Sequence, residues 1–171
     1  MASRVDQKVM RLLKSGVCSV QQQREELKEL EPAGKKVLHR IAEGEQPVEH
    51  IKLRGNAILA LGWMEDESSL EVLQKLIQTE EPPLQLRALR AVGRWRSTPF
   101  PAQIRALIRD PHTRPDVALA AARVSVKLGN QEVVSELEEL RTRLLPLVST
   151  PRSPSIVSLD RLIAKAEKQE A

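Results

Sequence analysis

Arginine is the residue type whose spacing in this chain most clearly indicates a binding chemistry. Arg87, Arg90 and Arg94 fall at positions i, i+3 and i+7, which places them on one face of a helix. A guanidinium group offers paired N–H donors to a carboxylate or a phosphate, so a row of them favours an anionic partner. The same side chains can instead bond Asp or backbone carbonyl groups of a neighbouring repeat, or be solvated. The candidate binding residues are Arg54, Arg87, Arg90, Arg94, Arg105, Arg109, Arg123, Trp63 and Trp95.

The two tryptophans belong to this set because of their positions. Trp63 follows Gly62 directly, Trp95 lies two residues after Gly93, and Phe100 is the chain's one other aromatic residue. Tryptophan is favoured in binding hot spots, and it also fills gaps between packed helices, so both roles stay open. Three aromatic residues are too few for a platform on which single-stranded nucleic acid stacks.

No residue pattern in the sequence points to catalysis or to a metal. The histidines, at positions 39, 50 and 112, have no second His or Cys at the spacing of metal ligands. Cys18 is the single cysteine, and no motif supplies a base that would lower the pKa of its thiol. Ala33-Gly34-Lys35-Lys36 lacks the spacing of a phosphate-binding loop. We therefore expect a protein that is not an enzyme and that uses no cofactor and no metal.

The elements that must position the arginines are predicted by a repeated string. Ala57-Ile58-Leu59-Ala60-Leu61-Gly62 recurs as Ala88-Leu89-Arg90-Ala91-Val92-Gly93, and a looser third copy ends at Gly129. Successive glycines are 31 and 36 residues apart, a period typical of stacked helical hairpins. We expect the three glycines to end helices in a left-handed conformation, and the alanines to let backbones approach closely.

Apolar residues recur at helical period in the segments between turns, which predicts ten helices and no strand. Ser68, followed three residues later by Glu71, predicts a capping box at one helix start. Pro32 and Pro115 are expected in first helical turns, whereas Pro82, Pro83 and Pro154 are placed in turns. The predicted helices span residues 3–14, 19–30, 33–43, 48–62, 68–79, 84–95, 101–109, 115–129, 131–145 and 155–169.

Length and composition predict one helical domain over residues 1–171. Hydrophobic residues make up 41% of the chain but aromatic residues only 2%, so the core must be Leu, Val, Ile and Ala. Such a core suits packed helices better than a β-sandwich. Charges run through the first 25 residues and no apolar run approaches the ~18 residues of a membrane span. With one cysteine, these features lead us to expect a soluble, cytoplasmic protein.

Charge is distributed unevenly along the chain. The total is +4, yet residues 84–127 contain nine Lys or Arg against two Asp, a net charge of +7, which leaves −3 for the rest. Residues 65–81 contain six acidic residues against Lys75. A basic middle beside an acidic segment indicates a polar surface that could attract a partner. A second basic row, Arg4, Lys8 and Arg11, is interpreted as a solvated face rather than a membrane anchor.

The chain resembles the HEAT-repeat family of helical repeat proteins, to which armadillo repeats are also related. The resemblance is carried by Leu53-Arg54…Ala57…Leu61-Gly62 and by Leu86-Arg87-Ala88…Val92-Gly93, and it covers residues 48–129. The third copy departs from the pattern, with Val124 and Lys127 where the family prefers alanine. The resemblance implies an all-α, right-handed α-solenoid of about five antiparallel helix pairs, with residues 1–31 and 131–171 as capping helices.

The resemblance also implies a class of function. In HEAT-like proteins the second helix of each pair lines a concave wall, where Arg54, Arg90, Arg94 and Arg123 would form a positive stripe. These proteins are mostly scaffolds and adaptors, so we expect a protein–protein interaction scaffold that binds an acidic partner protein there. Two alternatives stay open: a HEAT-like protein that binds the phosphate backbone of nucleic acid, and an accessory or lyase-like subunit that acts on a partner protein.

Overall fold

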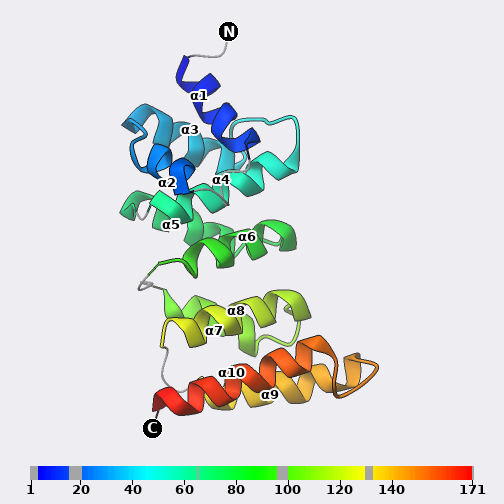
Figure 1. The fold of residues 1–171 in the computed structure, drawn as a ribbon. Coiled ribbons are helices and arrows are strands. Elements are labelled where there is room, and N and C mark those ends of the chain that lie inside the picture. Colours follow the sequence, from blue (N-terminus) through cyan, green and yellow to red (C-terminus); the bar gives the residue numbers. More distant parts are fainter. Residues whose placement is uncertain (1–3, 16–20, 65, 96–99, 130–132, 171) are drawn as a thin grey trace. The chain divides into compact units, whose positions relative to one another are not determined.

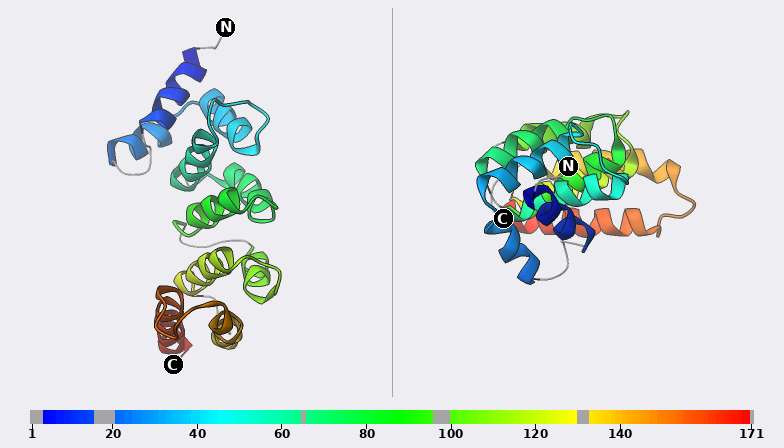
Figure 2. Two further views of the ribbon diagram at one scale, coloured as in Figure 1. Left: turned by 90° about the vertical axis from the view of Figure 1, so that its right-hand side faces the viewer. Right: turned by 90° about the horizontal axis from the view of Figure 1, so that it is seen from above.

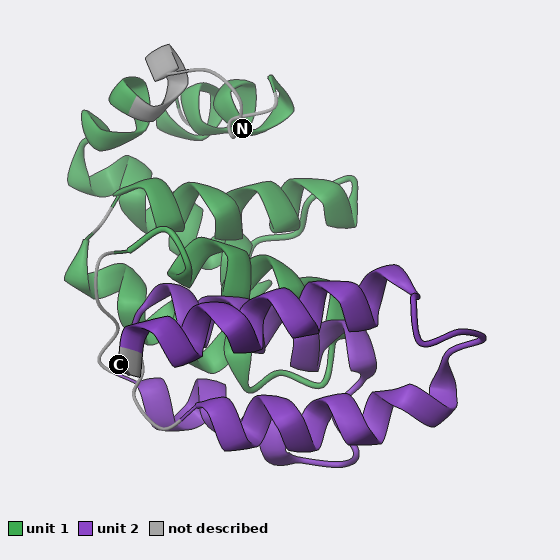
Figure 3. Ribbon diagram, turned by 60° about the horizontal axis from the view of Figure 1, so that its bottom comes forward, with its two compact units in different colours: residues 1–95 green, residues 96–171 purple. Residues whose placement is uncertain are grey.

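A computed structural model describes residues 4–15, 21–64, 66–95, 100–129 and 133–170 of the chain (Figure 1). Within these ranges the chain forms helices joined by turns, and no described residue lies in a strand. The expectation of an all-α protein is therefore confirmed. Cys18 lies outside the described residues. The chain divides into two compact units, Met1–Trp95 and Arg96–Ala171, which Figure 3 shows in different colours.

The described part of the first unit consists of six helices. Helices α3 and α4 pack against each other, as do α5 and α6, and α1 and α2 pack on α3 and α4. Figure 2 shows the pairs α3–α4 and α5–α6 of this unit as successive layers. The helices are α1 (Arg4–Lys14), α2 (Gln21–Lys28), α3 (Pro32–Glu43), α4 (Ile51–Met64), α5 (Glu67–Ile77) and α6 (Pro82–Val92).

The second unit repeats this plan. Helix α7 packs against α8, and α9 packs against α10, with a short 3₁₀ turn η1 after α9. Its core contains Ile104, Ile108, Leu137, Ile156 and Leu159, all at most 1% exposed. The elements are α7 (Pro101–Arg109), α8 (Pro115–Lys127), α9 (Val134–Leu144), η1 (Leu145–Leu147) and α10 (Pro154–Glu170).

Each of the ten predicted helices corresponds to an observed one, but two details of their ends were wrong. The N-cap of α5 is Asp66, not Ser68, because the Asp66 carboxylate accepts a hydrogen bond from the Ser68 backbone N–H. Prolines expected in turns instead open helices: α6 begins at Pro82 and α10 at Pro154. Proline has no N–H to lose in the first turn, so that position is tolerated.

The motif glycines differ from one another in their roles. Gly129 has a left-handed conformation (φ +67°) after α8, as expected. Gly93 is the C-cap of α6 but keeps a right-handed φ of −63°. Gly62 lies buried inside α4, where a Cβ atom would come within 2.7 Å of the Ala91 Cα atom. The prediction that Gly62 caps a helix is therefore wrong, since this glycine is needed for the close approach of α4 and α6.

Helix α4 is the central helix of the first unit. Its buried residues run without a break from Gly55 to Gly62, so apolar side chains cover it on all sides. A helix that is apolar all round must be surrounded by other elements, and α4 contacts α1, α2, α3, α5 and α6. Its one strongly exposed apolar side chain is Ile51 in the first turn, at 61% exposure.

Helices α4 and α6 run parallel with an offset close to the sequence period. Position 55 of α4 lies beside Arg87, position 62 beside Ala91, and Trp63 beneath Arg94. The partners in these three pairs are 32, 29 and 31 residues apart in the sequence. The residue number increases in the same direction along both helices, so the helices are parallel. The repeated string therefore marks equivalent helices that stack directly on each other.

The first helices of the two hairpins in this unit, α3 and α5, show the same offset. Three side-chain contacts join them, between residues 30 to 32 positions apart. These contacts are Lys35 Nζ–Asp66 Oδ2 at 2.9 Å, His39 Nε2–Ser69 Oγ at 3.1 Å and Lys75 Nζ–Glu43 Oε1 at 2.9 Å. Helices α3 to α6 of the first unit are thus arranged in two layers, with α3 beside α5 and α4 beside α6.

The second unit is joined in a similar way, with a wider range of offsets. Contacts from α7 to α9 connect residues 27 to 35 positions apart, and the contact from α8 to α10 connects Arg123 with Ser158, 35 positions apart.

Candidate partner-binding surface

Arg54 is held inside its own unit. Its Nε atom donates to the Ala42 carbonyl oxygen at 2.9 Å and its Nη2 atom donates to the Glu43 carbonyl at 3.2 Å, at the C-terminus of α3. Its Nη1 atom pairs with Glu81 at 3.2 Å, and 18% of its side chain is exposed. Cationic groups favour the negative end of a helix. Arg54, in the first turn of α4, therefore connects the end of α3 with Glu81 at the start of α6. This is the structural role that the sequence had left open as an alternative to partner binding.

Arg87 and Arg90 are the members of the arginine set that are left available to a partner. The stem of Arg87 covers Gly55, so that a Cβ atom there would meet its Cγ, Cδ and Nε atoms at 3.5–3.8 Å. Arg90, three residues further along α6, is exposed. Neither guanidinium makes a hydrogen bond or ion pair with another described residue. Their positive charge is therefore uncompensated locally.

Arg94 and the tryptophans form the end of the same surface. The Arg94 guanidinium carbon lies 4.2 Å from the centroid of the Trp63 ring, within the range of a cation–π contact. This contact joins α4 to the end of α6. Trp95 is half-buried at the end of the first unit. Trp63 therefore packs between hairpins, which was one of the two roles expected for it.

Arg105 and Arg109 turn toward a carboxylate of their own unit. Both guanidinium groups bond Glu136 of α9, whose side chain is only 6% exposed. Arg105 Nε lies 2.9 Å from Glu136 Oε1 and 3.1 Å from Oε2. Arg143 adds bonds to the carbonyl oxygens of Ile108 and Arg109 at 2.9 and 3.1 Å. Charge-assisted bonds of this kind tie α9 to the end of α7.

Arg123, the last member of the expected stripe, is exposed on α8 and donates to Ser158 Oγ at 3.0 Å. It belongs to the second unit, whereas Arg54, Arg90 and Arg94 belong to the first. Within the first unit Arg87 and Arg90 lie on α6, and Arg94 follows its C-cap, Gly93.

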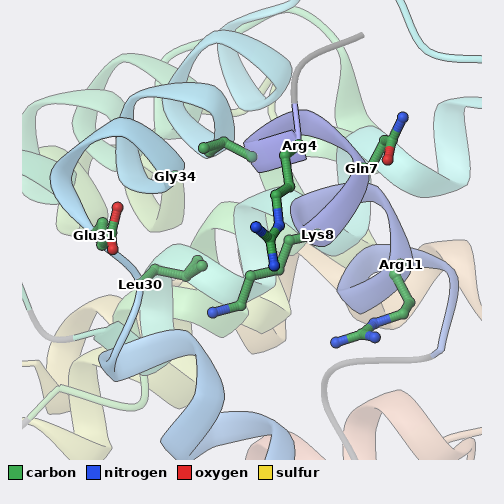
Figure 4. Close-up of a pocket in the computed structure, with 8 residues that line it drawn as sticks. Arg4, Gln7, Lys8, Arg11, Leu30, Glu31 and Gly34 are labelled. Carbon is green, nitrogen blue, oxygen red and sulfur yellow. The ribbon is translucent and has the colours of Figure 1, made fainter.

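A groove that the sequence did not reveal as a site lies between α1 and α3 of the first unit. It has a volume of about 780 Å³. Figure 4 shows Arg4 and Lys8 extending from α1 toward Leu30, with Arg11 further along the same helix. All three cations were interpreted as a solvated face. The spacing at i, i+4 and i+7 was visible in the sequence, but the wall facing it comes from the packing of α3 and could not be read there.

Two titratable side chains that bond between α3 and α5, His39 and Asp66, have shifted pKa values. Burial lowers the pKa of His39, and Lys35 lowers it further, while the carboxylates of Glu43 and Asp66 oppose the shift. Hydrogen bonds from Lys35 and from the Ser68 backbone lower the pKa of Asp66. These groups support the packing of α3 on α5. In the described parts of the chain, no three His, Cys, Asp or Glu side chains gather in a way that could hold a metal ion.

Comparisons with known proteins do not indicate a function for this chain. No protein family profile matches the chain, and no curated protein matches it. Among solved structures, the crystal structure of an engineered protein from the Northeast Structural Genomics Consortium is similar: it is 16% identical, with a TM-score of 0.49, and the match covers 96% of this chain and 81% of that chain. Among the described helices none is both long and apolar enough to cross a membrane.

Proposed function

We propose that this chain is a non-enzymatic adaptor of the HEAT-like type, an α-solenoid that binds an acidic segment of a partner protein. The solenoid is supported by the parallel stacking of equivalent helices within each unit, with partners about one hairpin apart in the sequence. Such stacks present extended surfaces on rigid helices. A single cysteine also fits the proposed work in a reducing compartment such as the cytoplasm.

The proposed binding surface lies on α4 and α6, the second helices of the two hairpins in the first unit. The observation that carries the proposal is that Arg87 and Arg90 have no partner among the described residues, while Arg54 and Arg94 beside them are engaged. Arg87 lies flat on Gly55, which limits its freedom before binding. Less conformational entropy is then lost when it meets a carboxylate.

An exposed apolar side chain extends this surface. Ile51 lies one helical turn before Gly55, the residue that the Arg87 stem covers, on the same face of α4. A partner that offers both carboxylates and an apolar residue satisfies this combination. A phosphate backbone could pair with the arginines but would offer no apolar group to Ile51. We therefore favour a protein partner.

Charge reversal tests this proposal directly. We expect the wild-type protein to bind a labelled twelve-residue Glu/Leu peptide in fluorescence polarisation, and not to bind the same peptide with Lys in place of Glu. A proline at the centre of both peptides keeps them from forming a helix. Arg87→Glu combined with Arg90→Glu should weaken binding by at least about tenfold, because attraction becomes repulsion. Added salt should weaken wild-type binding, since exposed charges are screened.

The matched control is Lys36→Glu combined with Arg40→Glu, two exposed cations of α3 that give the same change in net charge. We expect this control to stay within about twofold of the wild type. Equal loss in both variants would show non-specific attraction and would contradict the proposal. Binding of duplex DNA in the absence of peptide binding would favour the nucleic-acid alternative instead.

A further inference from the structure

The groove between α1 and α3 combines a row of cations with an apolar floor. Arg4, Lys8 and Arg11 are exposed on α1 and form its basic wall. With a rise of about 1.5 Å per residue, the row is about 10 Å long, or two helical turns. Val5 and the buried Leu30 line the floor. The opposite wall is α3, where Gly34 has no side chain to fill the space (Figure 4).

Two cations of the basic row lie where they destabilise the helix that carries them. Arg4 and Lys8 are like charges at i, i+4 and repel each other, and Arg4 in the first turn opposes the helix dipole. None of the three cations makes an ion pair with a described residue. Lys14, one turn after Arg11, does pair, with Glu49 at 3.5 Å. The three cations of the row are thus not engaged in ion pairs with described residues.

Helix α1 is fixed in place under this row. Its opposite face is buried through Val9, Leu12 and Leu13. The buried Asn56 of α4 donates from Nδ2 to the Leu13 carbonyl oxygen at 2.9 Å. An amide that is 8% exposed and bonds a helix end fixes both the register and the orientation of α1. The three cations are therefore held in line rather than carried on a loose segment.

We propose that this groove binds an acidic amphipathic helix of a partner protein. A helix that lies in a groove presents side chains at i, i+3 or i+4, and i+7, which is the spacing of the basic row. Carboxylates at these positions would meet Arg4, Lys8 and Arg11. Apolar residues on the adjoining stripe would cover Val5 and Leu30.

The composition of the groove favours a peptide over a nucleic acid. Glu31 lies on the rim and would repel a phosphate, whereas a partner helix can place a lysine or an amide opposite it. A sugar–phosphate chain would bury little apolar surface on the floor of the groove, whereas a Leu or Ile side chain would bury much of it. This surface is separate from the one on α4 and α6, and the inference does not depend on that proposal.

A designed peptide tests the groove in the full-length protein. The probe is a 14-residue capped helix with Glu at positions 3, 7 and 10 and Leu on the adjoining stripe, and its partner has Lys at the same three positions. We expect the Glu peptide to bind the wild type and to shift the methyl NMR signals of Val5 and Leu30. Lys8→Glu combined with Arg11→Glu should weaken it at least about tenfold and should bind the Lys peptide instead.

The control variant is Arg161→Glu combined with Lys165→Glu, one exposed Arg and one exposed Lys on α10. Together with the Arg87→Glu, Arg90→Glu variant, it should keep the peptide-induced shifts of the Val5 and Leu30 methyl signals, which report on the groove and not on α6. Loss of these shifts in either variant overturns the groove proposal, as do shifts confined to residues that do not line the groove. The proposal is also overturned if the protein binds duplex DNA and not the peptide. It is overturned as well if light scattering shows that the protein self-associates and that this association prevents peptide binding. Loss in the α6 variant alone would separate the two surfaces and favour the first.

Discussion

At the scale of single residues, His39 links the packing of α3 on α5 to pH. It bonds Ser69 Oγ, and burial lowers its pKa in the folded protein. The unfolded chain therefore binds more protons near and below pH 6.5. The contribution of neutral His39 to stability is fully present at pH values above the pKa that His39 has in the unfolded chain. It is lost as the pH falls through the lower pKa that His39 has in the folded protein.

We predict that His39→Gln reduces this loss of stability in acid. Glutamine keeps a donor and an acceptor for Ser69 but does not titrate. In urea unfolding at pH 7.5 and pH 5, the free energy of unfolding should fall less for the variant than for the wild type. His50→Gln removes an exposed imidazole as a control. An identical fall in wild type and His39→Gln would show that His39 plays no part.

Residue roles were the least predictable feature of the sequence. The arginines were identified as candidates from their spacing, but the partner of Arg105 and Arg109 is Glu136, about 30 positions away on α9. Nothing near Glu136 in the sequence marks it as the buried acid. A carboxylate chosen by packing across layers is defined only once the register of the helices is known.

At the scale of elements, Gly62 makes the closest approach among the glycines described in the first unit. A Cβ atom there would lie 2.7 Å from the Ala91 Cα atom, which is backbone and cannot rotate away. At Gly55 in the same helix, the nearest atom to a Cβ would be Arg87 Nε at 3.5 Å, an ordinary contact on a flexible side chain. Helix α4 thus contains one glycine, Gly55, that can accept a methyl group and another, Gly62, that cannot.

We predict that Gly62→Ala destabilises the protein by about 1–3 kcal/mol through overpacking. This outweighs the gain of about 1 kcal/mol that alanine brings to a helix interior. Gly55→Ala should be neutral or stabilising by up to that gain. Chemical denaturation of the two variants measures the difference directly. A stabilised Gly62→Ala variant would mean that α6 does not pack this closely on α4.

Element positions were well predicted because the signals are local. Periodic apolar residues and helix-breaking prolines identify the ten helices, and the 31-residue period corresponds to the α4–α6 offset. The role of Gly62 was misread because a glycine near a predicted helix end resembles a cap. Its true function depends on Ala91, a contact that local sequence does not show. Gly44, which does take a left-handed conformation at the end of α3, lies outside the motif.

At the scale of the whole molecule, the chain divides into the units Met1–Trp95 and Arg96–Ala171, each with its own buried core. The sequence predicted a single domain over the full length, and that statement about folding stays a prediction. Periodicity extends through both units and gives no sign of a division. The sequence therefore predicts the helices better than the way in which they group into units.

We predict that residues 1–95 fold without the rest of the chain. The α4 core and the α3–α5 contacts lie entirely within this segment. The fragment should show helical circular dichroism and a cooperative thermal transition. The same fragment carrying Gly62→Ala should melt at a lower temperature. A non-cooperative, weakly helical fragment would instead support one domain that folds only as a whole.

The placement of the indole rings has a practical consequence. Both tryptophans, Trp63 and Trp95, belong to the first unit, and the chain has no tyrosine. Intrinsic emission therefore reports on the first unit alone, while far-ultraviolet ellipticity sums over every helix. A denaturation experiment that records both signals in one cuvette can show, without any label, whether the two halves of the chain lose structure together or one after the other.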